Sequence, residues 1–349
     1  MDTLRYTKIE GDSAYHIFSK SIGSFRTLCS YRDSILRFMT FVGVAHPSAI
    51  LMIKPSELEK HIIVFLTTLI DSDKSRSYVE INYSPIKLFL IMNDVVLNWH
   101  KIRRFFLSSL RVRDEKQDGA RTSNDRAYKL EEISKLLQVL DIRGRAAVLL
   151  LLSSGVRIGA LEELRIRHIH KFDKHDIFGI LVYGGQSSFE SALLPGTIPR
   201  DAYFTFATPQ ATSAIEIMLD VRRSHGEVIT ADSPLFRAEY DKRDKVASRN
   251  EVKIATAQSF RTSISRAAIE IGLRTPNAFA NSYGRHDVMI CHGFRKTFNT
   301  ALHRALPDDP ITKERLMGHK VGFERNYLRP PIEFLLTKHV KAIPFLTVT

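Results

Sequence analysis

Apolar residues recur at intervals of three and four along the first third of the chain, which is the pattern of helices that bury one face. The pattern covers three stretches, residues 24–43, 56–70 and 84–97. Three prolines stand where a helix can begin, at Pro47, Pro55 and Pro85. The pattern therefore predicts a helical domain over residues 1–111.

A polar stretch interrupts this pattern. Residues 111–127, RVRDEKQDGARTSNDRA, hold almost no apolar side chain and mix charges with Gly and Ser. Such a composition is typical of a solvated tether. Some of its arginines are also suited to touch a phosphate backbone, and this alternative stays open. We predict a linker over residues 112–127, followed by a second domain with a C-terminal tail over residues 128–349.

The pattern in the second domain predicts helices around a small sheet. Helical periodicity covers residues 129–141, 143–155, 157–166, 212–226 and 259–273. In the third of these helices Ile158, Leu161 and Leu164 share one stripe, which we expect to be buried. Residues 176–185 and 202–208 are rich in β-forming side chains and predict strands. The predicted fold class is α+β, mainly helical with a small antiparallel sheet.

Composition and charge point to a partner. The chain has 349 residues, of which 44% are apolar, so it is long enough for two ordinary globular domains. Its formal net charge is +13 and its pI about 9.7, which favours a polyanionic partner. A basic protein without a nucleic-acid role has the same composition, so charge alone leaves both alternatives open.

Cysteines and apolar runs give no sign of an extracytoplasmic or membrane protein. Cys29 and Cys291 cannot build a disulfide framework, and neither falls in a C-x-x-C metal pattern. Residues 1–16 lack the charged-then-apolar layout of a signal peptide. The longest apolar run, residues 146–152, is far shorter than the roughly 20 residues that span a bilayer. We expect a cytoplasmic protein that uses no membrane, metal or cofactor.

Candidate chemistry begins with an H-x-x-R pair. If residues 291–306 form a helix, Phe294, Phe298 and Leu302 bury one stripe. His292 and Arg295 then lie three residues apart on a neighbouring face and can reach one target. A guanidinium fork beside an imidazole suits a phosphate group. About one such pair is expected by chance in this composition, so a capping or core role for this histidine stays open.

The next predicted helix ends directly before a second histidine. Asp308 or Asp309 is suited to cap it, Pro310 fits its first turn, and Gly318 is a C-terminal stop. His319 follows that stop and is therefore held by a rigid element.

Two further residues complete the candidate set. Tyr327 lies eight residues after the second histidine and precedes a break at residues 329–331, RPP. For a tyrosine taken alone, simple packing accounts equally well for this position. Arg157 follows a helix that Gly155 closes, and such a position aims a side chain into a cleft better than into a core.

Taken together and in order, these segments resemble the tyrosine recombinase (phage integrase) family. Residues 153–164, SSGVRIGALEEL, match its first arginine box. Residues 292–298, HGFRKTF, match its H-x-x-R box, and LMGHK with Tyr327 matches its closing box. The resemblance covers about residues 128–331 and extends more loosely to the N-terminal half, which looks like the core-binding domain of that family. The closing segment is most similar to archaeal or archaeal-virus integrases.

The resemblance implies a reaction and roles. Arg157 and Arg295 would hold the scissile phosphate of double-stranded DNA and stabilise the transition state. His292 and His319 would add hydrogen bonds and move protons. Tyr327 would attack phosphorus, giving a 3′-phosphotyrosyl link that a second strand rejoins without ATP or metal. The family works as a homotetramer on two duplexes, which implies a cytoplasmic, nucleoid-associated protein.

Two positions depart from the family pattern. An acidic residue usually stands three places after the first arginine, where this chain has Ala160, so that Glu162 or Glu163 is left as its substitute. The general acid of the family is a lysine in a turn of the small sheet. The best match here is Arg200, which holds an oxygen well but donates a proton poorly. Lys174, placed before the first predicted strand, is the alternative.

Two functions of different class follow. The chain is predicted to be a site-specific recombinase or integrase, and the alternative is a DNA-binding protein of the same fold with lost or weak catalysis. A metal-dependent nuclease is a weaker third option because no carboxylate cluster has ligand spacing. The apolar stripe in the tail, residues 331–349, is suited to pack on its own domain or on a neighbouring protomer.

Overall fold

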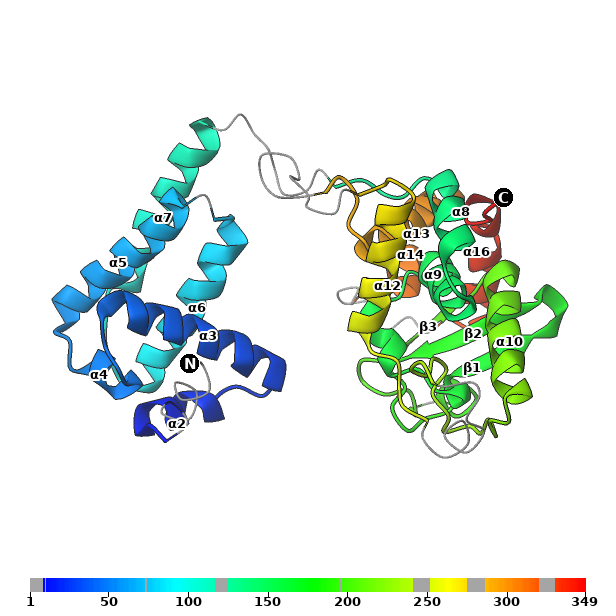
Figure 1. The fold of residues 1–349 in the computed structure, drawn as a ribbon, viewed down its shortest axis with the longest axis horizontal. Helices are drawn as coiled ribbons and strands as arrows, with labels where there is room; N and C mark the ends of the chain where they lie inside the picture. The colour runs from blue at the N-terminus through cyan, green and yellow to red at the C-terminus, as the bar shows by residue number, and fades with distance from the viewer. Residues whose placement is uncertain are drawn as a thin grey trace. The chain divides into compact units, whose positions relative to one another are not determined.

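The structure is a computed structural model that describes residues 9, 11–72, 74–116, 125–194, 196–240, 252–274, 286–319 and 330–349, with side chains of 111–116 excepted. The chain forms two compact units, Met1–Arg121 and Thr122–Thr349 (Figure 1). Each unit encloses its own cluster of buried apolar side chains.

The first unit is helical. Its described helices are α2 (Ser13–Lys20), α3 (Phe25–Val42), α4 (Pro47–Leu51), α5 (Pro55–Asp71), α6 (Arg76–Met92) and α7 (Trp99–Lys116). Their apolar stripes meet in a core that includes fully buried Phe18, Phe38 and Phe89. Helix α7 continues five residues beyond Arg111, into the stretch predicted as a linker.

The prediction that Pro85 begins a helix is wrong, because this proline lies inside α6. Proline has no N–H, so the carbonyl four residues earlier, at Ile81, loses its usual partner. The buried hydroxyl of Ser34 in α3 donates to that carbonyl at 3.1 Å. A hydrogen bond from a neighbouring helix thus replaces the missing one, and α6 continues through the proline.

The second unit is mainly helical around a small antiparallel sheet, as predicted. Its described helices are α8 (Leu130–Val139), α9 (Ile142–Ser154), α10 (Pro209–Ser224), α12 (Ala257–Glu270), α13 (His292–Ala305), α14 (Pro310–Leu316) and α16 (Ile332–Val340). Short 3-10 turns cover Ile158–Glu162, Ile166–His168, Asp173–His175, Ser191–Leu193 and Ile343–Phe345. The sheet has the order β1 (Ile169–Phe172), β2 (Ile177–Val182), β3 (Tyr203–Phe206) (Figure 1).

Two elements differ from the sequence predictions. Strand β1 was not predicted, because all four of its residues are half-buried and show no alternation of apolar and polar side chains. The helix predicted over 157–166 is a 3-10 turn at Ile158–Glu162. Ile158, Leu161 and Leu164 are nevertheless buried. The carboxylate of Glu162 accepts a hydrogen bond from the backbone N–H of Ala257, at the start of α12.

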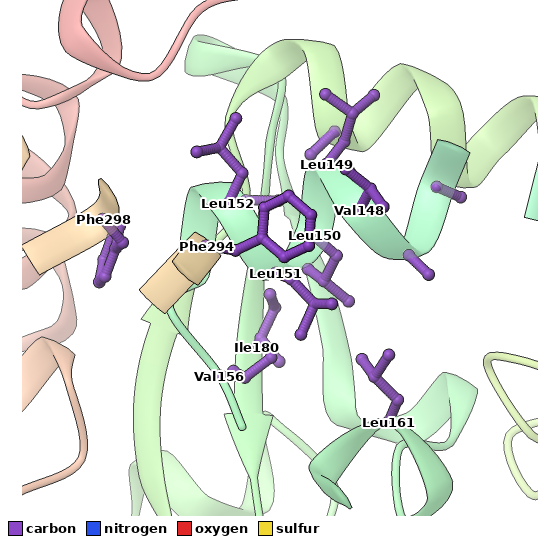
Figure 2. Packing of buried hydrophobic residues seen from close by; sticks show 14 of the residues in the cluster. Val148, Leu149, Leu150, Leu151, Leu152, Val156, Leu161, Ile180, Phe294 and Phe298 are labelled. Atoms are coloured by element: carbon purple, nitrogen blue, oxygen red, sulfur yellow. The ribbon is translucent and has the colours of Figure 1, made fainter. Parts of the chain in front are cut away.

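Helix α9 is the centre of the second unit. Every residue from Ala146 to Ser154 is buried, and Leu150 and Leu151 face Phe294 of α13 within the same cluster (Figure 2). Each fully buried Leu side chain contributes about 1.5–3 kcal/mol. The end of α9 is therefore held rigidly, which matters because Gly155 and Arg157 follow it.

The C-terminal tail packs on its own unit. The Nε2 of His339 in α16 donates to the carbonyl of Ser153 at 2.8 Å. The side-chain amide of Gln210 binds the backbone N–H and C=O of Val348 at 3.1 and 2.8 Å. Of the two alternatives for the tail, the structure shows docking within the chain.

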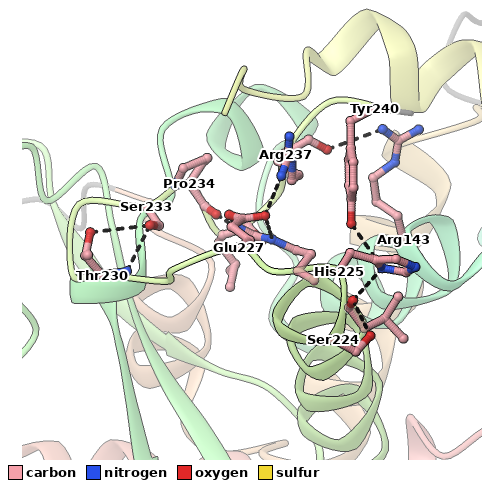
Figure 3. Close-up of polar contacts among 12 residues, drawn as sticks. Arg143, Ser224, His225, Glu227, Thr230, Ser233, Pro234, Arg237 and Tyr240 are labelled. Atoms are coloured by element: carbon pink, nitrogen blue, oxygen red, sulfur yellow. Dashed lines mark hydrogen bonds and ion pairs between the residues drawn. The ribbon is translucent and has the colours of Figure 1, made fainter. Parts of the chain in front are cut away.

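A buried ion-pair network fixes the loop after α10 (Figure 3). Glu227 pairs with Arg222 of α10 at 2.5 Å and with Arg237 at 2.6 Å. Burial tends to raise the pKa of Glu227, but hydrogen bonds from the two arginines outweigh it and hold the pKa below its ordinary value. These charges satisfy one another, so the network is structural.

Among the described residues, no helix is long and apolar enough to cross a membrane. Within the same ranges, no group of three or more His, Cys, Asp or Glu side chains is arranged to hold a metal ion. Cys29 and Cys291 are free thiols.

Candidate active site

Arg295 joins the ends of two helices. It lies on α13 with 4% of its surface exposed, on the face next to the buried stripe of Phe294, Phe298 and Leu302, as the periodicity predicted. Its guanidinium donates to the carbonyl of Gly155, to the carbonyl of Met317 at 2.6 Å and to Nε2 of His319 at 2.8 Å. Residues predicted from three separate segments thus meet at one guanidinium.

Gly155 ends α9 and so sets the position of Arg157 near Arg295. Its φ of 61° is a left-handed conformation that closes α9, and a Cβ there would overlap the ring of Phe298. Two residues later Arg157 is exposed between buried Val156 and Ile158. The base of this arginine is therefore anchored in the core while its side chain reaches solvent.

His319 is held by the end of α14. Asp309 caps the start of the helix by accepting from the N–H of Thr312 at 3.1 Å. At the other end, Gly318 has a φ of 67°. The N–H groups of Gly318 and His319 donate to the carbonyls of Arg315 and Glu314, both at 2.9 Å. This pair of bonds is the Schellman arrangement, and it fixes the backbone from which the imidazole projects.

Glu314 is a residue of the site that sequence reasoning missed. Its carboxylate Oε2 accepts a hydrogen bond from Nδ1 of His319. The signal was present, since a carboxylate five residues before a histidine that follows a glycine stop returns to the same end of the helix.

His292 opens α13 and is exposed. Partial burial lowers the pKa of His292, and the positive charges of Lys296 and Arg295 lower it further, whereas Asp125 opposes them. Asp125 is paired with Lys296 at 2.9 Å. A histidine with a lowered pKa is neutral at pH 7 and can accept a proton.

Tyr203 was also missed. It begins β3, and its ring occupies the space that a Cβ at Gly318 would need. Burial raises the pKa of Tyr203, and the charge of Arg295 opposes this rise. The ring of Tyr203 therefore packs beside Arg295 and against the backbone of Gly318, which precedes His319.

The two candidates for the general acid lie at opposite ends of the sheet. Lys174 precedes the first predicted strand, but the structure has an unpredicted strand, β1, before it. Lys174 is therefore exposed in the turn between β1 and β2. Arg200 is exposed three residues before Tyr203. Tyr203 pairs with Val182, at the end of β2, and the turn with Lys174 lies at the other end, about 17 Å away at 3.3 Å per residue. Arg200 is close to Tyr203 along the chain, and the strand register places Lys174 at the other end of the sheet.

Two further expectations have different outcomes. Tyr327 lies outside the described residues. Glu162 does not support Arg157, because its carboxylate binds the start of α12, and Glu163 is exposed. Among the described residues, the carboxylate of Glu314 contacts His319, and that of Asp125 pairs with Lys296 beside His292.

The arrangement suits a tetrahedral anion. Arg157, His292, Arg295 and His319 come from the ends of α9, α13 and α14. Burial lowers the pKa of Arg295, and the nearby charge of Arg157 adds to this effect while Tyr203 opposes it. The positive charges of Arg157 and Arg295 repel one another, and an anion bound between them would relieve that repulsion. The cluster therefore has the charges that an anion site requires.

No protein-family model matches the sequence, and no curated protein matches it. Solved structures are similar to it over most of its length. XerA recombinase is 17% identical with a TM-score of 0.40, over 94% of this chain and 98% of that one. The Tn1549 transposon integrase, solved with circular intermediate DNA, is 15% identical with a TM-score of 0.49, over 80% and 84%. A lambda integrase dimer bound to a core site is 16% identical with a TM-score of 0.47, over 90% and 93%.

Proposed function

We propose that this protein is a site-specific DNA recombinase or integrase that cleaves and rejoins strands through a 3′-phosphotyrosyl intermediate. The observation that supports this most strongly is the contact of buried Arg295 with both Gly155 and His319. Arg222 and Arg237 are buried on a carboxylate, whereas Arg295 donates to two carbonyls and an imidazole. Burying a guanidinium on such partners for packing alone is costly, which supports a role in binding an anion.

Each residue then has a chemical task. Arg157 and Arg295 hold the non-bridging oxygens of the scissile phosphate and stabilise the charge of the pentacoordinate transition state. His292 and His319 move protons. Tyr327 attacks phosphorus and releases a 5′-hydroxyl. Because the covalent link conserves the energy of the phosphodiester, the 5′-hydroxyl of a second strand can rejoin it without ATP.

Protonation of the leaving oxygen falls to Arg200. It lies at the Tyr203 end of the sheet, whereas Lys174 lies at the far end. Arginine holds a proton too tightly to transfer it readily, so this step is slower than it is with a lysine. A slow step of this kind is also what favours the alternative, a DNA-binding protein of the same fold with weak catalysis.

The partner is double-stranded DNA, which the net charge of +13 favours. The first unit, with its basic helix α7, acts as the core-binding domain, and the second as the catalytic domain. Exchange of strands between two duplexes requires four active sites and hence a homotetramer on DNA. Such a protein works in the cytoplasm at the nucleoid. The archaeal character of the closing segment stays a prediction.

A nicked suicide duplex tests the proposal. Its sequence is obtained by selecting bound fragments from random DNA. We expect the wild type to form a protein–DNA adduct that survives denaturation, because the cleaved strand diffuses away and prevents rejoining. Tyr327→Phe abolishes the adduct, whereas the control Tyr78→Phe, in α6, leaves it unchanged.

Three outcomes contradict the proposal. DNA binding without any adduct supports the DNA-binding alternative. Equal amounts of adduct from the wild type and from Tyr327→Phe would show that Tyr327 is not the nucleophile. Cleavage that stops in EDTA indicates a metal-dependent nuclease.

The assignment of the acid has its own test. In single-turnover assays on the same duplex, Arg200→Ala reduces the rate of adduct formation about 100-fold, because the leaving oxygen loses its partner. Lys174→Ala, at the other end of the sheet, changes the rate by no more than about twofold on the same grounds. The reverse result would reassign the role to Lys174.

A further inference from the structure

The imidazole of His319 has a different partner on each nitrogen. Nδ1 contacts the carboxylate of Glu314, from its own helix α14. Nε2 lies 2.8 Å from Nη2 of Arg295, on α13. The other described group packed here is the ring of Tyr203, against Gly318. Lys313 lies 3.6 Å from the second oxygen of Glu314.

These two partners require the same tautomer. A carboxylate can only accept a hydrogen bond, and a guanidinium can only donate one. Nδ1 must therefore carry the proton, and Nε2 must present its lone pair to Arg295. Because the backbone of His319 is fixed by the helix end at Glu314 and Arg315, the remaining freedom is that of the side-chain torsions, and the contact of Nδ1 with Glu314 restricts them.

We propose that Glu314 is the positioning residue that holds His319 with its proton on Nδ1 and makes Nε2 a proton acceptor in the active site, in addition to His292. The inference rests on the proposed function. When a phosphate draws Arg295 toward its oxygens, Nε2 is released, and the proton of the attacking hydroxyl passes to it. The resulting imidazolium stays paired with the carboxylate of Glu314, which keeps its negative charge throughout.

This assignment also accounts for a departure in the sequence. Ala160 stands where the resemblance leads one to expect an acidic residue, and Glu162 is bound to the start of α12. Glu314 brings a negative charge to the same basic cluster from α14 instead. It acts on His319, however, and not on Arg157, so its removal affects proton transfer before it affects phosphate binding.

The first test reads the tautomer directly and requires no DNA. Protein labelled with ¹⁵N-histidine is examined by long-range ¹H–¹⁵N correlation, and the signals of His319 are those missing from His319→Gln. We expect the Nδ1–H form in the wild type and in Glu314→Gln, whose amide oxygen still accepts the hydrogen bond. In Glu314→Ala the ring is free to turn away from Arg295, and the Nε2–H form, which is favoured in water, becomes dominant.

The second test reads the role in the reaction. In single-turnover adduct formation, Glu314→Gln keeps the ring in place but removes the charge that stabilises the imidazolium. The rate falls about tenfold at neutral pH. Glu333→Gln, an exposed glutamate of α16, leaves the rate unchanged. A merely structural role for Glu314 predicts a change in rate with no change in the tautomer of His319 in Glu314→Ala.

The outcomes separate this inference from the proposed function. An Nε2–H tautomer in the wild type, or the same tautomer in Glu314→Ala, overturns the positioning role even if adducts form. A rate of adduct formation by Glu314→Gln equal to that of the wild type also overturns it. The expected tautomers together with no adduct from any variant leave the positioning of His319 intact and remove the recombinase function.

Discussion

Single buried polar residues carry much of the site's geometry. Arg295 has three acceptors from two helix ends and uses Nη1 and Nη2 to reach them. Lysine in its place has one nitrogen and cannot span the carbonyls of Gly155 and Met317 at once. The contacts that assemble the site are therefore specific to a planar fork, not merely to a positive charge.

His339 makes the stability of the second unit depend on pH. Its side chain is fully buried, and burial lowers its pKa from 6.5 to about 4. Above about pH 6.5 the ring is neutral in both the folded and unfolded states. Between about pH 6.5 and 4 the unfolded chain binds a proton that the folded chain does not, so the free energy of unfolding falls as the pH falls through this window, by about 3 kcal/mol.

Urea unfolding of wild type and His339→Gln from pH 7 to 4 measures this effect. The glutamine amide can still donate to the carbonyl of Ser153 but does not titrate, so the variant loses about 3 kcal/mol less than the wild type over the window. Parallel pH curves for the two proteins would show that His339 is not the linked group.

At the scale of elements, two helix ends with left-handed glycines deliver the site. Gly155 closes α9 before Arg157, and Gly318 closes α14 before His319. Both glycines also leave room for an aromatic ring, that of Phe298 in the first case and of Tyr203 in the second. Each helix end is thus tied to a neighbouring element as well as terminated.

Gly318→Ala tests whether this second helix end matters. An alanine is strained at a φ of 67° and its Cβ meets the ring of Tyr203. The strain costs about 1–2 kcal/mol and the overlap about 1–3 kcal/mol more. The control Gly272→Ala has a φ of 72° with no atom within 4 Å of the new Cβ, so only the strain applies. Equal losses in urea unfolding would mean that Tyr203 yields freely.

Helices and their ends could be predicted from the sequence, and pairings between distant segments could not. The stripe of Phe294, Phe298 and Leu302, the cap at Asp309 and the stop at Gly318 follow from local spacing. The prediction for Pro85 was wrong because the hydrogen bond that allows this proline inside a helix comes from Ser34, 51 residues earlier in the chain.

The residues of the candidate site likewise fall into a group that local patterns predict and a group that depends on strand pairing. Its basic residues follow from motif order, whereas Tyr203 joins it through the register of β2 and β3, which no local pattern contains. Lys174 was misplaced for the same reason, because the half-buried strand β1 lacks a period of two.

At the scale of the whole molecule, the chain pairs a helical unit with a unit that carries the basic cluster, and its net charge of +13 suits a polyanion. The helix bearing His292 and Arg295 is also tied to the start of the second unit. Tyr128 stacks on Phe294 at 4.5 Å, and Lys296 pairs with Asp125. The first described residues of the second unit therefore pack against the helix that carries the site.

The most direct measurement is the identity of the residue that carries the DNA. The adduct formed on the suicide duplex is digested with nuclease and protease, and the peptide bearing the nucleotide remnant is sequenced by mass spectrometry. The account predicts that the remnant is on Tyr327. A remnant on another residue, such as Tyr203 beside Arg295, or the absence of any modified peptide from DNA-bound protein, would contradict it.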